Sequence, residues 1–233
     1  MKRIIQPFFG GMGDSLEHSH LPRRFSEQGD EVYLSSRAQF RNTQIKKLVW
    51  DMNPFIKGLS DDEPNAGDAA VSYRNDGLGF MSNWESVHGL KPETKYPEVY
   101  YRPKTLSSLQ DKTLVDLSCV SLSPDYNKDQ LLEIAKSYPN YMSMLFVSNI
   151  SDGHFDLNDN LNGYVIHNIF DYCDAIYSCK KFVCLFAGGN ALASALQRTK
   201  KIDVDCLIVD CPKTQSALKQ DLFFFDNINY IWI

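Results

Sequence analysis

The stretch Phe9-Gly10-Gly11-Met12-Gly13-Asp14 decides the fold, because it joins a predicted strand to a predicted helix. Residues 3–9 form an apolar run typical of a strand, and the helix is expected to continue to about residue 28. Glycine permits a positive φ and close approach of the backbone, and a helix start offers free N–H groups with partial positive charge. The stretch therefore predicts an α/β fold with a site for an anion or a sugar phosphate at its first turn.

This first glycine loop differs from the common nucleotide motifs. No Gly-Lys-Ser/Thr follows it as in a Walker loop, and its spacing is not the usual GxGxxG. A purely structural turn, with Asp14 as the helix N-cap, is the alternative. In the ligand-binding interpretation, Asp14 takes a proton from a hydroxyl nucleophile. His18 lies four residues later on the predicted helix and can face the same cleft.

A second glycine loop repeats this device late in the chain. Residues 182–186 predict a buried strand, which runs into Gly188-Gly189-Asn190 and a helix over 191–197. A diphosphate could rest on the N–H groups of Gly189 and Asn190. Close packing of helix on sheet without a ligand is the alternative. Ser121 follows another predicted strand, at the position where open α/β sheets bind ligands.

Apolar runs alternate with helical patterns along the whole chain, which is typical of βαβ units and parallel sheets. We expect two Rossmann-like lobes, residues 1–105 and 106–233, with the two glycine loops facing an interdomain cleft. Residues 60–104 are rich in loops, with one strand candidate at 69–73 and an irregular lid packed by Trp84. The other predicted strands are 31–35, 113–122, 141–147, 204–209 and 230–233, and the other predicted helices are 42–50, 127–137 and 169–179.

Composition narrows the function classes. The chain has 233 residues, 43% of them hydrophobic, and a formal net charge of -5, which disfavours coating of nucleic acid or of an anionic membrane. Six cysteines in apolar surroundings predict buried reduced thiols. No signal peptide or membrane span is evident, so a cytoplasmic location is expected. Asp203 and Asp205 resemble a metal-binding DxD motif only in spelling, and no metal or cofactor is expected.

Several of these stretches resemble GT-B glycosyltransferases. Residues 10–14, with Leu21-Pro22 and residues 29–32, are similar to the opening of the glycogen synthase and heptosyltransferase-like types. Residues 182–196 resemble the donor-phosphate motif of heptosyltransferases of glycosyltransferase family 9, in a shortened chain. Phe186 and Ala191 stand where those enzymes usually carry an aspartate and a histidine.

The resemblance implies a nucleotide-sugar donor in the C-terminal lobe and a glycan or other hydroxyl acceptor in the N-terminal lobe. It makes Asp14 the base of a metal-independent glycosyltransferase, with the second loop binding the donor diphosphate. A non-catalytic nucleotide-sugar or glycan-binding module is the alternative, and a nucleotide-sugar epimerase is a third hypothesis. The candidate catalytic residues are Asp14 and His18, and the candidate binding residues are Gly10, Gly11, Met12, Gly13, Ser121, Gly188, Gly189 and Asn190.

Overall fold

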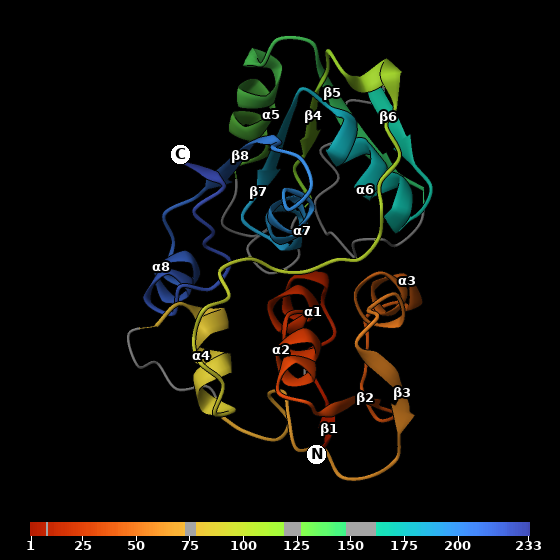
Figure 1. Ribbon diagram of the computed structural model, residues 1–233. Coiled ribbons are helices and arrows are strands. Elements are labelled where there is room, and N and C mark those ends of the chain that lie inside the picture. The colour runs from red at the N-terminus through yellow and green to blue at the C-terminus, as the bar shows by residue number, and fades with distance from the viewer. Residues whose placement is uncertain (8, 73–77, 119–126, 148–161) are drawn as a thin grey trace. The chain divides into compact units, whose positions relative to one another are not determined.

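The computed structural model describes residues 1–7, 9–72, 78–118, 127–147 and 162–233 of the chain (Figure 1). The chain forms two compact units. Unit 1 comprises Met1–Tyr101 and Gln220–Leu222, and unit 2 comprises Arg102–Lys219 and Phe223–Ile233. Each unit is built around its own parallel sheet. The predicted α/β class with two parallel sheets is therefore confirmed.

Unit 1 holds a three-stranded parallel sheet in the order β1-β2-β3. In β2, Val32 and Leu34 are fully buried while Glu31 is exposed, as expected for a strand whose inward side chains meet the core. The strands are β1 (Lys2–Ile5), β2 (Glu31–Ser35) and β3 (Ile56–Ser60). The helices are α1 (Met12–His18), α2 (Leu21–Glu27), α3 (Thr43–Lys46), the π-helix η1 (Lys47–Asp51) and α4 (Phe80–Val87).

Three predictions for unit 1 are wrong in detail. The single helix after the first glycine loop is two helices, because the chain turns at Ser19 and His20 and Pro22 stands in the first turn of α2. Residues 69–72 form a turn instead of a strand, and Tyr73 lies outside the described residues. The third strand of the unit 1 sheet is β3 instead, which lies before residues 69–73 in the chain. The predicted irregular lid contains a regular helix, α4, in which Trp84 is buried as expected.

Unit 2 holds a six-stranded sheet in the order β6-β5-β4-β7-β8-β9, with all its pairs parallel. The chain leaves β4 toward β5 on one side and later returns to β7 on the other. This is the strand order of doubly wound dinucleotide-binding folds, which bind ligands beyond the carboxyl ends of the strands where the order reverses. In unit 2 that switch point lies between β4 and β7. The strands are β4 (Thr113–Asp116), β5 (Tyr141–Phe146), β6 (Gly163–Ile166), β7 (Lys181–Leu185), β8 (Asp203–Ile208) and β9 (Asn229–Trp232).

Helices cover both faces of this sheet. The connections through α6 and α7 run in the opposite direction across the sheet from the connection through α5, so right-handed crossovers place α5 on the other face. In agreement, α6 and α7 pack against each other (Figure 1). Burial on both faces agrees with the burial of all four residues of β4 and with the apolar run that ends β7. The helices are the 3-10 turn η2 (Ser107–Leu109), α5 (Lys128–Ser137), α6 (Ile169–Ser178), α7 (Gly188–Leu196) and α8 (Pro212–Lys219).

The cysteines of unit 2 agree with the sequence prediction as far as they are described. Cys173, Cys179, Cys184, Cys206 and Cys211 are all buried and free of disulfides. Burial raises the pKa of the Cys173 thiol above its ordinary value, so this thiol stays protonated near neutral pH. Cys119 lies outside the described residues.

Candidate functional site

Gly10 in the first loop lets two backbone segments meet. Its carbonyl accepts a 2.9 Å hydrogen bond from the Arg41 N–H. A Cβ atom at Gly10 would lie 2.6 Å from the Gln39 carbonyl oxygen and 2.7 Å from the Cα of Phe40. These atoms belong to backbone that cannot easily give way, so the segment after β2 requires glycine here. Backbone packing alone therefore explains why position 10 is a glycine, whether or not the loop binds a ligand.

Gly11 and Asp14 form the start of α1. Gly11 is the N-cap, so Asp14 does not hold the N-cap position of the alternative, purely structural interpretation. Asp14 lies in the first turn instead, and its carboxylate accepts hydrogen bonds from the N–H groups of Gly11 and Asp14. A Cβ atom at Gly11 would lie 2.5 Å from Asp14 Oδ2, so a side chain at this position would displace the carboxylate from where it lies. Met12 is half-buried and Gly13 is buried.

The environment of Asp14 suits a base. Burial raises the pKa of its carboxyl group above the ordinary value, and electrostatic interactions with His18 and Arg41 oppose this shift. The side chain is only partly buried, so it is accessible from solvent. Sequence reasoning missed Arg41, although its place after the second predicted strand, at the carboxyl edge of the sheet, is the available signal.

His18 is the buried last residue of α1. Its Nδ1 is 2.9 Å from the backbone oxygen of Asp14, and its ring packs on Trp84 with centroids 4.9 Å apart. The side chain is 3% exposed, and its Nε2 has no hydrogen-bond partner in the described part of the chain. His18 thus contacts the backbone of Asp14, and its role in catalysis stays a prediction.

His88 belongs to an aromatic cluster with Trp84 and His18. The Trp84 ring contacts both histidines, and it stacks on His88 with the ring centroids 6.0 Å apart. The N–H of Gly67 donates to His88 Nε2 at 3.1 Å, so that nitrogen is unprotonated. Burial lowers the pKa of His88 from 6.5 to about 4.

We expect this histidine to make unit 1 sensitive to acid. Below pH 6.5 the unfolded chain takes up a proton at His88, whereas the folded chain does so only near pH 4, so stability falls across this window. The expected loss is about 2–3 kcal/mol at pH 4 relative to pH 7. Urea unfolding of the wild type and of His88→Gln, whose amide oxygen can accept from Gly67, measures it. An identical loss in both proteins would contradict the prediction.

The second glycine loop follows β7 at the switch point of unit 2. Ala187 is the extended N-cap of α7, and Gly188 is the first helical residue. The Asn190 N–H donates to the Ala187 carbonyl at 3.2 Å, whereas the N–H groups of Gly188 and Gly189 have no acceptor among the described residues. Gly188 is half-buried and Gly189 is buried. The donors available to a ligand are therefore those of Gly188 and Gly189, one position earlier than predicted.

Asn190 is fully buried and joins α7 to the segment that follows α8. Its Nδ2 donates to the Phe223 carbonyl at 2.8 Å, and its Oδ1 has no partner among the described residues. Tyr230 Oη donates to the same carbonyl at 2.9 Å. Phe223 has a φ of 61°, a left-handed conformation that is rare for an aromatic residue. The ligand-binding role of Asn190 stays a prediction.

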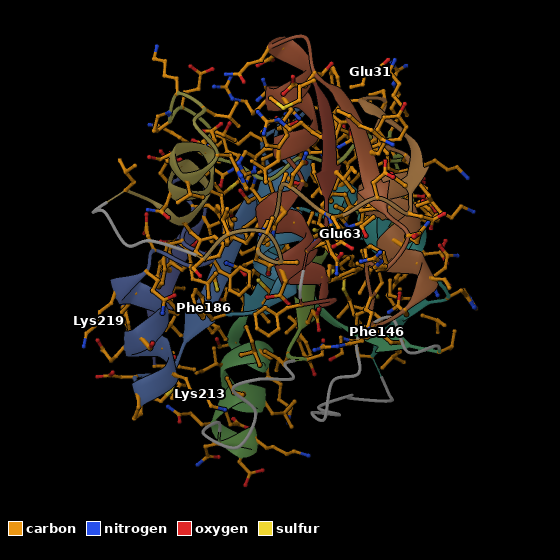
Figure 2. The ribbon with its side chains drawn as sticks, turned by 90° about the horizontal axis from the view of Figure 1, so that it is seen from below. Glu31, Glu63, Phe146, Phe186, Lys213 and Lys219 are labelled. Carbon is orange, nitrogen blue, oxygen red and sulfur yellow. The ribbon has the colours of Figure 1, made fainter. Side chains whose placement is uncertain are left out.

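Phe186, which is labelled in Figure 2, follows the last residue of β7. It packs against other aromatic side chains. Its ring centroid lies 4.8 Å from that of Phe224, 6.1 Å from that of Phe223 and 6.5 Å from that of Tyr230. Phe186 is 3% exposed, and Ala191 in α7 is fully buried. The two positions at which the sequence resemblance implied an aspartate and a histidine are thus filled by core side chains.

Asp116 and Tyr172 form a polar floor beneath Gly189, which sequence reasoning missed. Asp116 ends β4, and its Oδ2 accepts a hydrogen bond from Tyr172 Oη. A Cβ atom at Gly189 would lie 2.7 Å from Tyr172 Oη and 3.5 Å from Asp116 Oδ2. The only sequence signal was a single aspartate at the end of an apolar run.

We expect Gly189→Ala to destabilise unit 2. The added methyl group meets a fully buried hydroxyl that its bond to Asp116 holds in place. Overpacking of this kind costs about 1–3 kcal/mol. Gly188→Ala is the matched control, because Gly188 is partly exposed at the first helical position. Urea unfolding of both variants measures the difference, and equal stabilities would show that the floor does not constrain Gly189.

Two further sequence predictions concern Ser121 and the possible metal motif of Asp203 and Asp205. Ser121 lies outside the described residues. Asp205 accepts hydrogen bonds from Lys181 Nζ at 2.8 Å, Tyr138 Oη at 3.0 Å and Asn229 Nδ2 at 2.8 Å. Within the described ranges, no three His, Cys, Asp or Glu side chains cluster as metal ligands, and no helix is long and apolar enough to cross a bilayer.

Solved structures share this arrangement, although no protein-family model and no curated protein sequence matches the chain. The ADP-heptose LPS heptosyltransferase II of E. coli superposes with a TM-score of 0.66 at 11% identity, over 99% of this chain and 89% of that one. A glycosyltransferase family 9 protein from Veillonella parvula gives 0.64 at 7%, over 100% and 85%. The chain has the fold of the GT-B heptosyltransferases. The expected resemblance is confirmed at the level of fold.

A third similar structure carries a ligand. The dodecameric iron-containing heptosyltransferase TibC, in complex with ADP-D-β-D-heptose, gives a TM-score of 0.60 at 14% identity. The match covers 88% of this chain and 57% of TibC, so the chain spans little more than half of that protein. These identities establish a shared fold, and activity and substrates are matters of proposal.

Proposed function

We propose that this protein is a glycosyltransferase that moves a sugar from a nucleoside diphosphate sugar to a hydroxyl group of an acceptor, without a metal ion. The observation that carries the proposal is the second glycine loop, where the N–H groups of Gly188 and Gly189 open α7 beside the switch point between β4 and β7. Such N–H groups bind phosphate well. The fold shared with heptosyltransferases supports the same assignment.

In the proposed reaction Asp14 removes the proton from the acceptor hydroxyl. The oxygen forms a bond to the anomeric carbon of the donor, the bond from that carbon to the diphosphate breaks, and the diphosphate leaves with the electron pair. The N–H groups of Gly188 and Gly189 stabilise its charge, as preorganised donors do. Residues 106–233 hold the donor and residues 1–105 the acceptor, and that the two loops face a common cleft stays a prediction.

Arg41 and His18 are assigned supporting roles. The Arg41 guanidinium lowers the pKa of Asp14 and so favours the ionised form that accepts a proton. His18 holds the backbone of Asp14 through its Nδ1 and acts as a positioning residue. Gly10 and Gly11 shape the loop, because a side chain at Gly10 would meet backbone atoms and one at Gly11 would displace the Asp14 carboxylate.

We expect Arg41→Met to shift the acid limb of the pH–rate profile to higher pH. Transfer requires ionised Asp14, and loss of the positive charge raises its pKa. The expected shift is about 0.5–1 pH unit. Arg37→Met is the control, because Arg37 is an exposed arginine that pairs with Glu63. Profiles of kcat/KM measure the shift, and a limb that stays in place would exclude this role for Arg41.

One experiment distinguishes the proposal from its alternatives. The protein is incubated with ADP, UDP and GDP sugars, with and without a panel of glycan acceptors, and all products are identified by mass spectrometry and NMR. A glycosylated acceptor among the products would show sugar transfer. An altered free nucleotide sugar without acceptor would show an epimerase.

A non-catalytic nucleotide-sugar or glycan-binding module remains the second candidate. The aromatic packing around Phe186 and the burial of Ala191 favour it, because neither position carries a polar group for a donor. Donor or glycan binding without turnover against the whole acceptor panel would establish it.

A further inference from the structure

The polar floor beneath the second loop contains a buried carboxyl group. Asp116 is 5% exposed, and its described partners are all hydrogen-bond donors: Tyr172 Oη, the Ser118 N–H at 2.9 Å and Ser118 Oγ. Burial raises the pKa of this carboxyl group, and the hydrogen bonds from Ser118 and Tyr172 oppose that shift because they stabilise the ionised form. None of the described groups that contact Asp116 is a cation. The ionised form therefore lacks a neutralising partner within that set.

This carboxylate lies close to where the proposed donor phosphate binds. Its Oδ2 is 3.5 Å from the position of a Cβ atom at Gly189. A phosphate oxygen that accepts a hydrogen bond from the Gly189 N–H therefore lies within roughly 9 Å of Asp116 Oδ2, because two covalent bonds of about 1.5 Å each separate that Cβ position from the nitrogen and an N–H···O bond adds about 3 Å. At that distance in a partly buried site, each added negative charge on the ligand weakens binding by about tenfold.

We propose that Asp116 is a specificity-determining residue, whose carboxylate beneath Gly189 makes the loop prefer a nucleoside diphosphate sugar over the corresponding nucleoside diphosphate. The inference rests on the proposed function. In the nucleotide sugar each phosphate carries one negative charge, whereas the free diphosphate gains another at its terminal phosphate near pH 8. The same residue then weakens retention of the diphosphate that the transfer reaction releases.

The test measures a ratio of affinities. Dissociation constants for ADP and ADP-glucose, UDP and UDP-glucose, and GDP and GDP-mannose are determined by calorimetry at pH 8 for the wild type and for Asp116→Asn. For any pair that binds, we expect the substitution to strengthen binding of the free diphosphate about tenfold more than binding of its sugar conjugate. A merely structural role would change both constants by the same factor, and that result would overturn the inference while leaving the proposed function intact.

Two further variants keep the test decisive. Asp205→Asn removes another buried carboxylate of the same sheet, one that pairs with Lys181, and should leave the ratio unchanged. Asp116→Ser, which also removes the charge, replaces Asp116→Asn if that variant does not fold, and the same tenfold change is expected. If no pair binds to the folded wild type, the proposed function is overturned and this inference with it.

Discussion

Asp14→Asn is expected to lower the rate of sugar transfer by about 10²- to 10⁴-fold, the usual contribution of a positioned base. The amide oxygen can still accept hydrogen bonds from the N–H groups of Gly11 and Asp14 that reach the carboxylate, so the loop should keep its shape. The amide cannot take a proton from the acceptor hydroxyl. Initial rates with a donor and acceptor that support transfer measure the loss.

The comparison needs a control for folding and for binding. Asp62→Asn changes an exposed carboxylate of the same unit, which pairs with Lys2, and should keep full activity. Calorimetric affinity for the donor should stay within about twofold in Asp14→Asn, since the donor is assigned to the other unit. Full turnover in Asp14→Asn with normal donor binding would show that Asp14 is not the base.

Glu85→Gln is expected to destabilise unit 1 by about 3–5 kcal/mol, the cost of breaking a buried ion pair from one side. Glu85 is fully buried, and its Oε1 accepts from Arg24 Nε at 2.7 Å. Its Oε2 accepts from the N–H groups of Glu93 at 2.7 Å and Thr94 at 2.9 Å. The substitution leaves Arg24 with only the partly exposed carboxylates of Glu27 and Glu93, and it can turn an amide N–H₂ toward backbone donors.

Urea unfolding measures this loss. The network fastens the segment around Thr94 to α2 and α4, so the effect should be large and cooperative. Glu63→Gln is the matched control, because Glu63 pairs with Arg37 in an exposed ion pair that contributes little. A change in Glu85→Gln no larger than in the control would mean that the buried pair does not stabilise this unit.

The sequence predicted best the elements that local chemistry dictates. The buried run of β7 and the small residues of α7 identified a strand followed by a helix close to a sheet, and both are present. The strand β2 has the predicted boundaries. Asn127 caps α5 with its side chain, and the predicted helix begins beside it.

Elements whose formation depends on distant contacts were missed. The strand β3 contains Gly58 and an exposed Leu59, so it lacks an apolar signal and forms through its pairing with β2. The helix α4 lies among glycines and prolines that predicted loops, and the buried side chains of Trp84 and Glu85 hold it. Such contacts leave no local periodic pattern in the sequence.

The residues of the candidate site also fall into those that the local sequence predicts and those that only the fold brings together. Asp14 and the second glycine loop could be found because glycine, strand and helix follow one another along the chain. Arg41 and Asp116 come close to these loops only through the fold, from segments far away in the sequence. The first loop also shows that a glycine next to a helix start can be needed for packing and not for a ligand, since Gly10 makes room for the backbone of residues 39–41.

Binding of a nucleotide sugar at the N–H groups of the second loop is the central claim, and calorimetry on two variants of Gly188 tests it most directly. Gly188 is the first helical residue of α7, where proline is tolerated, so Gly188→Pro removes one N–H donor and Gly188→Ala keeps it. We expect proline to weaken binding of ADP-glucose, or of whichever nucleotide sugar the wild type binds, by about 10- to 100-fold, the loss of one hydrogen bond to a charged group. Alanine should leave the affinity nearly unchanged. Equal affinity in the wild type and Gly188→Pro, with both proteins folded, would contradict the claim.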